Sequence, residues 1–137
     1  MTLPLREERM AVFDSQVFVT FLRATVSPMP FGAGKCALHV RLALKQAGLE
    51  PLLQPISAKD WGKTLLALGF GIGPADAIDA VSGDIAVIQP TSDSIHGHIQ
   101  GFDGRQWISD FVQKRGFWPG PKFRDERPGF VIYRWEG

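Results

Sequence analysis

The stretch GAGKCALHVRLALKQAG, residues 32–48, contains the single cysteine of this 137-residue chain, Cys36. It begins with glycines and continues with apolar residues at helical spacing as far as Ala47, after which Gly48 is a typical helix stop. The spacing therefore predicts a helix whose first turn contains the cysteine. At that end of a helix the backbone N–H groups are unpaired and the helix dipole is positive, and both effects stabilise a thiolate.

The position of Cys36 favours a role as a nucleophile. The same N–H groups can hold the oxyanion that forms when a thiolate attacks a carbonyl, and Gly32 and Gly34 would let a substrate approach the backbone closely. We expect the pKa of this thiol to lie below its usual value of ~8.5. The alternative is that Cys36 is a small buried hydrophobic residue at the start of an alanine-rich helix.

Composition and charge limit the classes of protein to consider. With 45% hydrophobic and 21% charged residues, the chain fits one globular domain over residues 1–137, with residues 1–12 as an N-terminal extension. Fifteen basic and fourteen acidic residues argue against a dedicated nucleic-acid-binding protein. The locally basic stretch 105–127 is interpreted as a solvated surface. A single cysteine excludes an intrachain disulfide and a multi-cysteine metal site.

The sequence also bears on localisation. No apolar run reaches the ~18 residues of a membrane span, so we expect no membrane insertion. The N-terminal sequence MTLPLREERM has no apolar core and is unlike a Sec signal peptide. These features predict a protein that is made in the cytoplasm and does not leave by the Sec pathway.

Two further helices are predicted in the first half of the chain. One covers residues 14–25, with Asp14 as its N-cap. The other covers residues 57–69, with Ser57 as its cap and Asp60 at the capping-box position. The sequence GFGIGPADAIDAVSG that overlaps its end is predicted to be a loop.

After Gly83 the apolar period changes from helical spacing to alternation. This change predicts short strands at residues 84–89, 98–102, 106–112 and 129–135. Helices followed by an antiparallel meander predict an α+β fold in which N-terminal helices pack on an antiparallel β-sheet.

A nucleophilic cysteine needs a base, and the chain has three histidines. His39 follows Cys36 by three residues on the same helix, a spacing that rarely gives a pair aligned for proton transfer. His96 belongs to the loop before the strand, whereas His98 lies inside the strand, where a rigid sheet can fix an imidazole against the thiol. A metal pair formed by His96 and His98 lacks a nearby third ligand, so we expect no metal.

The partner that orients His98 should come from the strand that follows. A two-residue turn at 103–104 would place Ser109 opposite His98, whereas a three-residue loop at 103–105 would place Asp110 there. A bulge at the turn would bring Asp110 diagonal to His98. We prefer Asp110, because a carboxylate stabilises the imidazolium that forms during catalysis.

Three segments together carry a resemblance to a known family. The segments are GxxKCAxxVRxAL, then Gly83-Asp84 leading an apolar strand, then GHIQGFDGRQWISDF, and they occur in this order between about Asp14 and Tyr133. The set resembles the papain-like cell-wall amidases of the NlpC and CHAP type. It is most similar to the small peptidoglycan amidase effectors of bacterial type VI secretion systems.

The resemblance implies an activity and a site. It implies hydrolysis of an amide in the peptidoglycan stem peptide by an antibacterial toxin, with Cys36 as nucleophile, His98 as base and Asp110 as the third catalytic residue. It further implies a cognate immunity protein as partner and delivery to the periplasm of target cells. The absence of a Sec signal would also fit a phage lysin or a domain of a longer chain.

The residues by themselves predict acyl transfer through a thioester, which needs no cofactor. Two tryptophans, Trp61 and Trp118, are candidates for the walls of a substrate groove. A papain-like deamidase or acyltransferase toxin acting on a protein would use the same residues. A non-catalytic wall-binding module, in which Cys36 only packs, is the remaining alternative.

Overall fold

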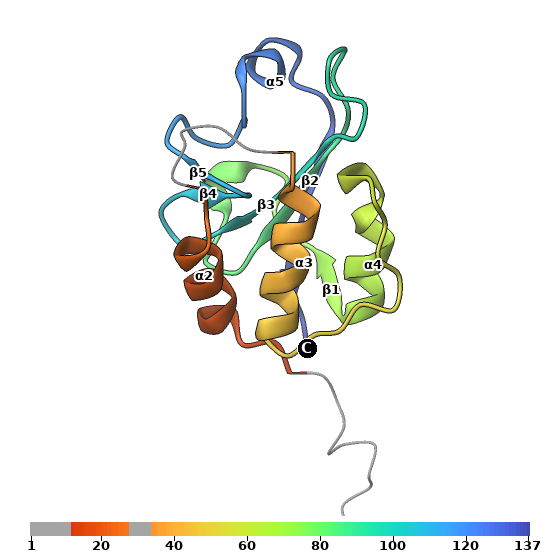
Figure 1. Ribbon diagram of the computed structural model, residues 1–137, viewed down its shortest axis with the longest axis vertical. Coiled ribbons are helices and arrows are strands. Elements are labelled where there is room, and N and C mark those ends of the chain that lie inside the picture. Colours follow the sequence, from red (N-terminus) through yellow and green to blue (C-terminus); the bar gives the residue numbers. More distant parts are fainter. Residues whose placement is uncertain (1–11, 28–33) are drawn as a thin grey trace, which may run out of the picture.

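The computed structural model describes residues 12–27 and 34–137. A six-stranded sheet, in which every strand pair is antiparallel, forms the centre, and its strand order is β1-β6-β2-β3-β4-β5. Three helices, α2, α3 and α4, lie side by side on one face of this sheet, and the short helix α5 lies beyond one end of it (Figure 1). The described part of the chain therefore has the predicted α+β architecture, with the N-terminal helices on an antiparallel sheet.

The strands and helices have the following bounds. The strands are β1 Phe70–Ile72, β2 Ile85–Ile88, β3 His98–Phe102, β4 Trp107–Ile108, β5 Val112–Gln113 and β6 Phe130–Trp135. The helices are α2 Ser15–Ala24, α3 Cys36–Gln46, α4 Trp61–Leu68 and α5 Pro121–Glu126, and two short 3-10 turns cover Ala58–Asp60 and Ala77–Asp79.

The first two helices start where the sequence predicts. Asp14 is the N-cap of α2, and its side chain accepts a hydrogen bond of 3.1 Å from the backbone N–H of Val17. Helix α3 begins at Cys36 itself and ends within two residues of Gly48, which has a φ of 102°. The thiol therefore sits in the first turn of a helix, as expected.

Helix α4 differs from the prediction at its start. A 3-10 turn precedes it, and neither Ser57 nor Asp60 makes a capping hydrogen bond with its side chain. The Ser57 hydroxyl is instead 2.6 Å from Nδ1 of His96. The capping-box prediction was wrong because a tertiary partner takes the hydroxyl. The stop at Gly69, with a φ of 117°, is confirmed.

Strand β1 and helix α5 were not predicted, and strand β6 does not lie at the edge of the sheet, where a meander would place the last strand. Strand β1 falls inside the predicted loop, and α5 lies in a stretch for which we predicted no element. Strand β6 is central and not at the edge, because it pairs with both β1 and β2. Three-residue strands are defined by such long-range pairing, so their own sequence gives no period to detect.

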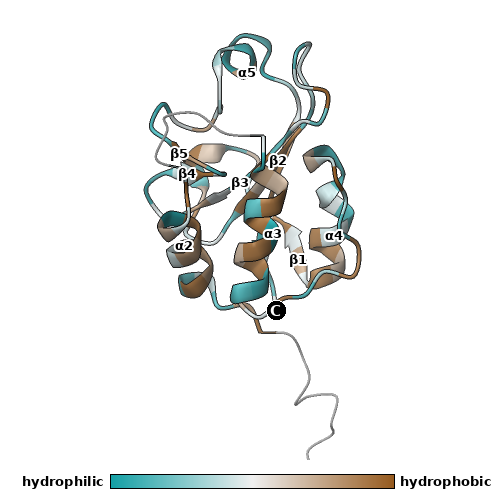
Figure 2. Cartoon of the chain, viewed as in Figure 1, coloured by the Kyte–Doolittle hydropathy of each residue, from teal (hydrophilic) through white to brown (hydrophobic). Residues whose placement is uncertain are grey.

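The strand residues alternate between two cores on opposite faces of the sheet. Ile85 and Val87 pack against the helices, whereas Ala86 between them joins a small aromatic cluster with Trp107 and Ile132. Apolar residues predominate along α2, which covers the first core (Figure 2). The larger core contains Phe18, Leu22, Val40, Leu44 and Leu65, each with no exposed surface.

The Gly83-Asp84 motif has a structural role. Asp84 has no exposed surface, and both of its carboxylate oxygens accept hydrogen bonds from Arg134 on β6, at 2.9 and 2.8 Å. Gly83 has a φ of 95°, and a Cβ there would lie 2.9 Å from the Cβ of Ser15. The motif therefore fixes β2 to β6 and to the start of α2.

Among residues 12–27 and 34–137, no helix combines the length and the apolar character that crossing a membrane requires. Residues 1–11 of the predicted extension lie outside the described residues, and so does Gly32.

Candidate active site

A cavity of about 280 Å³ lies where α3 begins and β3 starts. Its walls include Cys36, His98 and Asp110, so the structure brings the three predicted catalytic residues to one cavity. Gly34, which also lines it, has a φ of 75°, and none of the described residues comes within 4 Å of the place where its Cβ would be. The left-handed backbone beside the thiol therefore favours glycine.

The Cys36 thiol is half-buried and surrounded by backbone N–H groups. The N–H groups of Ile99, Ala37 and Cys36 itself point to the sulfur and lower its pKa. Two of these groups belong to the first turn of α3, and the third comes from the residue after His98. The arrangement is the one predicted for a helix N-terminus that can stabilise negative charge on sulfur and on an adjacent oxyanion.

Burial nevertheless decides the pKa of the thiol. Loss of solvent is the largest effect on Cys36 and raises its pKa above the ordinary value, and the negative charge of Asp110 raises it further. The predicted depression of the thiol pKa was therefore wrong. The helix and N–H groups act in the expected direction, but desolvation of a thiolate in this pocket outweighs them.

His98 is neutral for a related reason. The residue is 8% exposed, and burial lowers its pKa to about 4. The hydrogen bond that the ring donates to Gln113 and the charge of Asp110 act in the opposite direction. At neutral pH the site therefore holds a neutral imidazole beside a neutral thiol, so the resting state contains a base and a proton donor and no ion pair.

Gln113 defines which nitrogen of His98 carries the proton. Nε2 of His98 is 3.0 Å from Oε1 of Gln113. The Gln113 amide nitrogen donates to the carbonyls of Gly116 and Phe117, both at 3.1 Å, so the amide oxygen must face the histidine. Oε1 can only accept, which places the imidazole proton on Nε2. Nδ1 then carries the free lone pair that a general base requires.

The sequence prediction did not include Gln113. It belongs to the two-residue strand β5, which the long predicted strand over 106–112 did not separate from β4. The signal in the sequence is weak, a glutamine directly after the apolar residues Phe111 and Val112, and only the structure shows that this glutamine is buried.

The hairpin register differs from the two-residue turn, the three-residue loop and the bulge considered above. Phe102 pairs with Trp107, so the loop between β3 and β4 contains four residues. The side chain of Asp103 causes this, because Oδ1 accepts from the N–H groups of Arg105 and Gln106 at 2.8 and 2.6 Å. Strand β4 ends at Ile108, before it could place a residue opposite His98.

Asp110 consequently lies in the turn between β4 and β5. Its carboxylate accepts a hydrogen bond of 3.1 Å from the N–H of Lys35, and its carbonyl accepts one of 2.8 Å from Ser27. The carboxylate thus attaches this turn to the start of α3, and its charge acts on both Cys36 and His98. Ser109, the other candidate, is fully buried, and its hydroxyl has no hydrogen-bond partner among the described residues.

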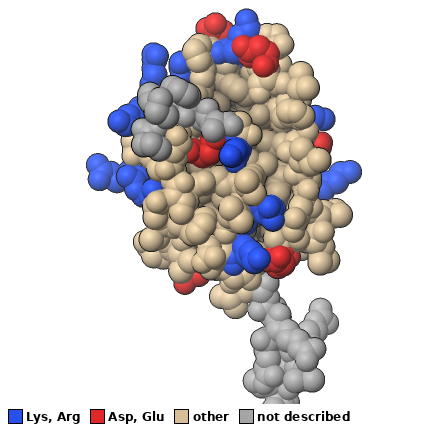
Figure 3. Space-filling model, viewed as in Figure 1, with Lys and Arg blue, Asp and Glu red and all other residues tan. Residues whose placement is uncertain are grey.

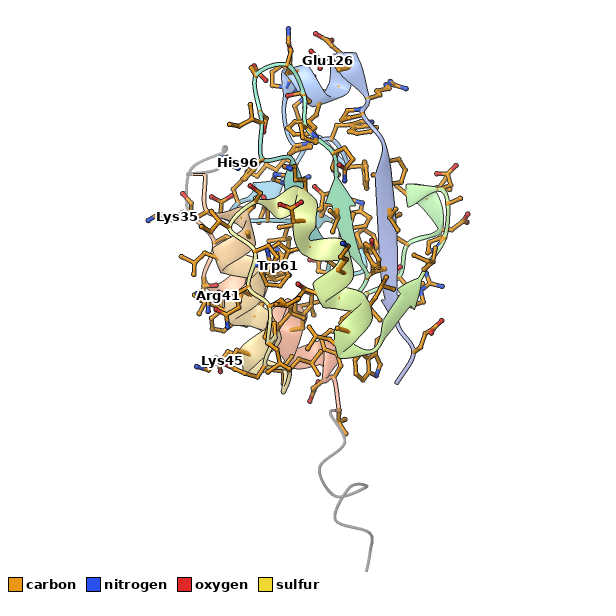
Figure 4. All side chains as sticks on the ribbon, turned by 90° about the vertical axis from the view of Figure 1, so that its right-hand side faces the viewer. Lys35, Arg41, Lys45, Trp61, His96 and Glu126 are labelled. Carbon is orange, nitrogen blue, oxygen red and sulfur yellow. The ribbon has the colours of Figure 1, made fainter. Side chains whose placement is uncertain are left out.

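The remaining histidines are placed away from the thiol or at the rim of its cavity. His39 is buried between α3 and α2, where Nε2 lies 3.1 Å from the carbonyl of Leu22 and 3.2 Å from the hydroxyl of Thr25. His96 is exposed at the cavity rim, at the same end of the molecule as Lys35 (Figure 4). Gly97, between His96 and His98, has a φ of 69°, and a Cβ there would collide with the carbonyl of Ile88.

The two tryptophans have different surroundings. Trp61 is 1% exposed and packs in the main core, with Nε1 donating to the carbonyl of Pro55 at 2.9 Å, so it does not line the cavity of Cys36. Trp118 is half-buried and lines a second cavity that adjoins the first. The described residues contain no group of three or more His, Cys, Asp or Glu side chains placed to hold a metal ion.

Comparisons with known proteins identify the class of this fold and site. No protein-family model matches the chain, and no curated protein sequence matches it either. Solved structures do match, and two of them are type VI effector–immunity complexes, so the class is that of type VI secretion effectors.

Both structures contain the Tae3–Tai3 complex from Ralstonia pickettii. The native complex matches with 35% identity and a TM-score of 0.83, over 90% of this chain and 100% of the matched chain. The selenomethionine form matches with 37% identity and a TM-score of 0.78, over 85% and 98% of the two chains. The chain belongs to the Tae3 family of type VI effectors.

Proposed function

We propose that this protein is a papain-like cysteine amidase of the NlpC and CHAP type that cleaves an amide bond in the peptidoglycan stem peptide. The observation that carries the proposal is the fixed tautomer of His98, whose Nε2 is held by Gln113 in the cavity that contains Cys36. Membership of the Tae3 family supports an antibacterial effector, and the resemblance of the three sequence segments to cell-wall amidases supports the substrate.

The reaction is acyl transfer to sulfur followed by hydrolysis. Nδ1 of His98 takes the thiol proton as Cys36 attacks the carbonyl carbon, and the N–H groups of the α3 terminus hold the oxyanion. The imidazolium then protonates the amine, which leaves as the C–N bond breaks and a thioester remains. His98 next takes a proton from water, which attacks the thioester and releases the carboxylic acid and the thiol.

In a simple triad one residue both orients the histidine and stabilises its positive charge, whereas here Gln113 has the first role and Asp110 the second. Gln113 holds the ring and its tautomer through the hydrogen bond to Nε2. The Asp110 charge raises the pKa of His98, so it favours the imidazolium that exists during the reaction. We therefore keep Asp110 in the catalytic set, as an electrostatic residue.

The wider biology of the proposal follows from the family. A cognate immunity protein would neutralise the enzyme, as the effector–immunity complexes of the related structures suggest. Delivery by a type VI system would bring the enzyme to the periplasm of a target cell, where its substrate lies.

Digestion of purified peptidoglycan tests the proposal directly. We expect the protein to release fragments with one new amine and one new carboxylate per cut, identified by mass spectrometry. Cys36→Ala should abolish release while the protein stays folded, because a small residue replaces another at a helix start. Intact peptidoglycan together with deamidation of a protein substrate would contradict the amidase assignment and favour the deamidase.

A further inference from the structure

A second cavity, of about 360 Å³, lies beside the catalytic one. The two share Phe111, Pro119 and Gly120 as walls, so they lie next to each other. Gln113, which holds the catalytic histidine, forms part of the wall of the second cavity. Its volume is within the usual range for a small-ligand site.

Among the described residues, the charged side chains that line the second cavity are all basic. They are Lys114, Arg115 and Arg124, and none of the described carboxylates lines the cavity. The ion pairs of the described residues are Arg23 with Asp103, Lys59 with Asp60, Lys122 with Glu126 and Arg134 with Asp84. None of the three cavity cations takes part in them. Lys and Arg side chains line the margin of the molecule where β4 and β5 lie (Figure 3).

The wall that carries these cations is held by packing. Trp118 makes edge-on contacts with Phe117 and Phe130, at ring-centroid distances of 5.0 and 5.8 Å. One nitrogen of Arg124 lies 3.4 Å from the Trp118 carbonyl, which leaves its other N–H groups for a ligand. The indole and the Arg124 guanidinium are therefore positioned before any ligand binds.

Helix α5 connects the two cavities. Its Phe123 lines the catalytic cavity, with its ring centroid 5.9 Å from that of His98, and the next residue, Arg124, lines the second cavity. The catalytic cavity contains the carboxylate of Asp110, which repels an anion, whereas the second cavity attracts one. An anionic group of a bound substrate is thus directed to one side of the reacting carbonyl.

We infer that the second cavity is a substrate subsite that binds a free carboxylate of the stem peptide next to the amide that is cut. This inference rests on the proposed amidase function. Stem peptides carry carboxylates at the C-terminus and on acidic residues, and guanidinium groups bind carboxylates in a bidentate manner. The indole of Trp118 contacts the carbon skeleton beside the carboxylate.

Binding to an inactive variant tests the inference without turnover. Two soluble stem peptides of the same sequence serve as probes, one with free carboxylates and one with these groups converted to amides. Against the Cys36→Ala protein, the carboxylate peptide should bind roughly tenfold or more tightly, as expected for charge-assisted hydrogen bonds. Adding Arg115→Gln and Arg124→Gln should remove most of this difference. Lys122→Gln, whose charge already pairs with Glu126, is the matched control and should preserve it.

The outcomes separate the inference from the proposed function. Equal affinity for the two peptides would overturn the inference, as would arginine substitutions that weaken only the binding of an immunity protein. A preference for the carboxylate peptide that depends on the two arginines supports it. Turnover by the unsubstituted protein is a separate measurement. Carboxylate-dependent binding without cleavage of either peptide would support the subsite and contradict the amidase.

Discussion

Replacing Gln113 with leucine removes the only acceptor that the described residues offer to Nε2 of His98. The Nε2–H group would then be buried without a partner, which costs about 1–3 kcal/mol. The ring can avoid this cost by rotating or by moving its proton to Nδ1, and both changes remove the catalytic lone pair. With RT of about 0.59 kcal/mol, 1–3 kcal/mol corresponds to a productive population smaller by roughly 5- to 150-fold. We expect kcat to fall by about 10- to 100-fold.

The substitution also damages the fold, so a matched variant is needed. Gln113 donates to the carbonyls of Gly116 and Phe117, and losing both bonds should destabilise the protein by about 2–4 kcal/mol. Gln113→Glu loses the same two bonds but keeps an oxygen that accepts from His98. Its negative charge should raise the pKa of His98 above about 4 and move the acid limb of kcat/KM to higher pH.

The assay is hydrolysis of a soluble stem peptide between pH 4 and 9, at a temperature where thermal denaturation shows both variants to be folded. On the alkaline plateau the glutamate variant should retain most of the activity, whereas the leucine variant should not recover at any pH. Equal losses in both variants on that plateau would refute the orienting role and leave Gln113 a purely structural residue.

Three further predictions test the electrostatics and the geometry of the site. Asp110→Asn should lower the pKa of the Cys36 thiol, so alkylation by iodoacetamide at pH 8 should become faster. The same substitution should slow peptide hydrolysis, because the imidazolium loses the charge that stabilises it. A change of the alkylation rate and the hydrolysis rate in the same direction would contradict this role of Asp110. Gly97→Ala should displace the start of β3 and reduce kcat at least tenfold, which crystallography and turnover together can check; unchanged turnover would show that the strand start is adaptable. The pKa of His98 is about 4 in the folded protein against 6.5 in the unfolded chain, so the unfolded state binds the proton first as pH falls. The free energy of unfolding should therefore be at its full value above pH 6.5 and lower by about 3 kcal/mol at pH 4. Urea titrations over this range should find a smaller dependence of the unfolding free energy on pH in His98→Gln, and an unchanged dependence would contradict the lowered pKa.

The sequence was informative where a local pattern and the tertiary structure agree. The helical spacing after Cys36 predicts α3 within two residues at either end, because its apolar face packs on the sheet, and the Asp14 cap is a local interaction. The register of the β3–β4 hairpin could not be chosen from strand alternation. It depends on Asp103, whose side chain closes a four-residue loop, and this shifts every residue after Trp107 relative to His98.

The site shows the same division between local and tertiary information. His98 was predictable because the strand after Gly97 gives a histidine a fixed direction, and the structure places it with Cys36 in one cavity. The hydrogen-bond partner of His98 was not predictable, because β5 exists only through its pairing with β4. The direction of the thiol pKa was also beyond the sequence, since it depends on how deeply the cavity buries the sulfur.

A neutral thiol beside a neutral imidazole has a chemical consequence. In the proposed reaction, the separated charges of a thiolate and an imidazolium form while sulfur attacks the carbonyl, so groups that stabilise those charges act on the transition state and hardly on the resting enzyme. In this proposal the N–H groups at the start of α3 stabilise the negative charge, and Asp110 stabilises the positive one. Because the raised thiol pKa keeps Cys36 protonated until a substrate is aligned, the same burial that opposes thiolate formation also protects the single cysteine from unspecific alkylation and oxidation.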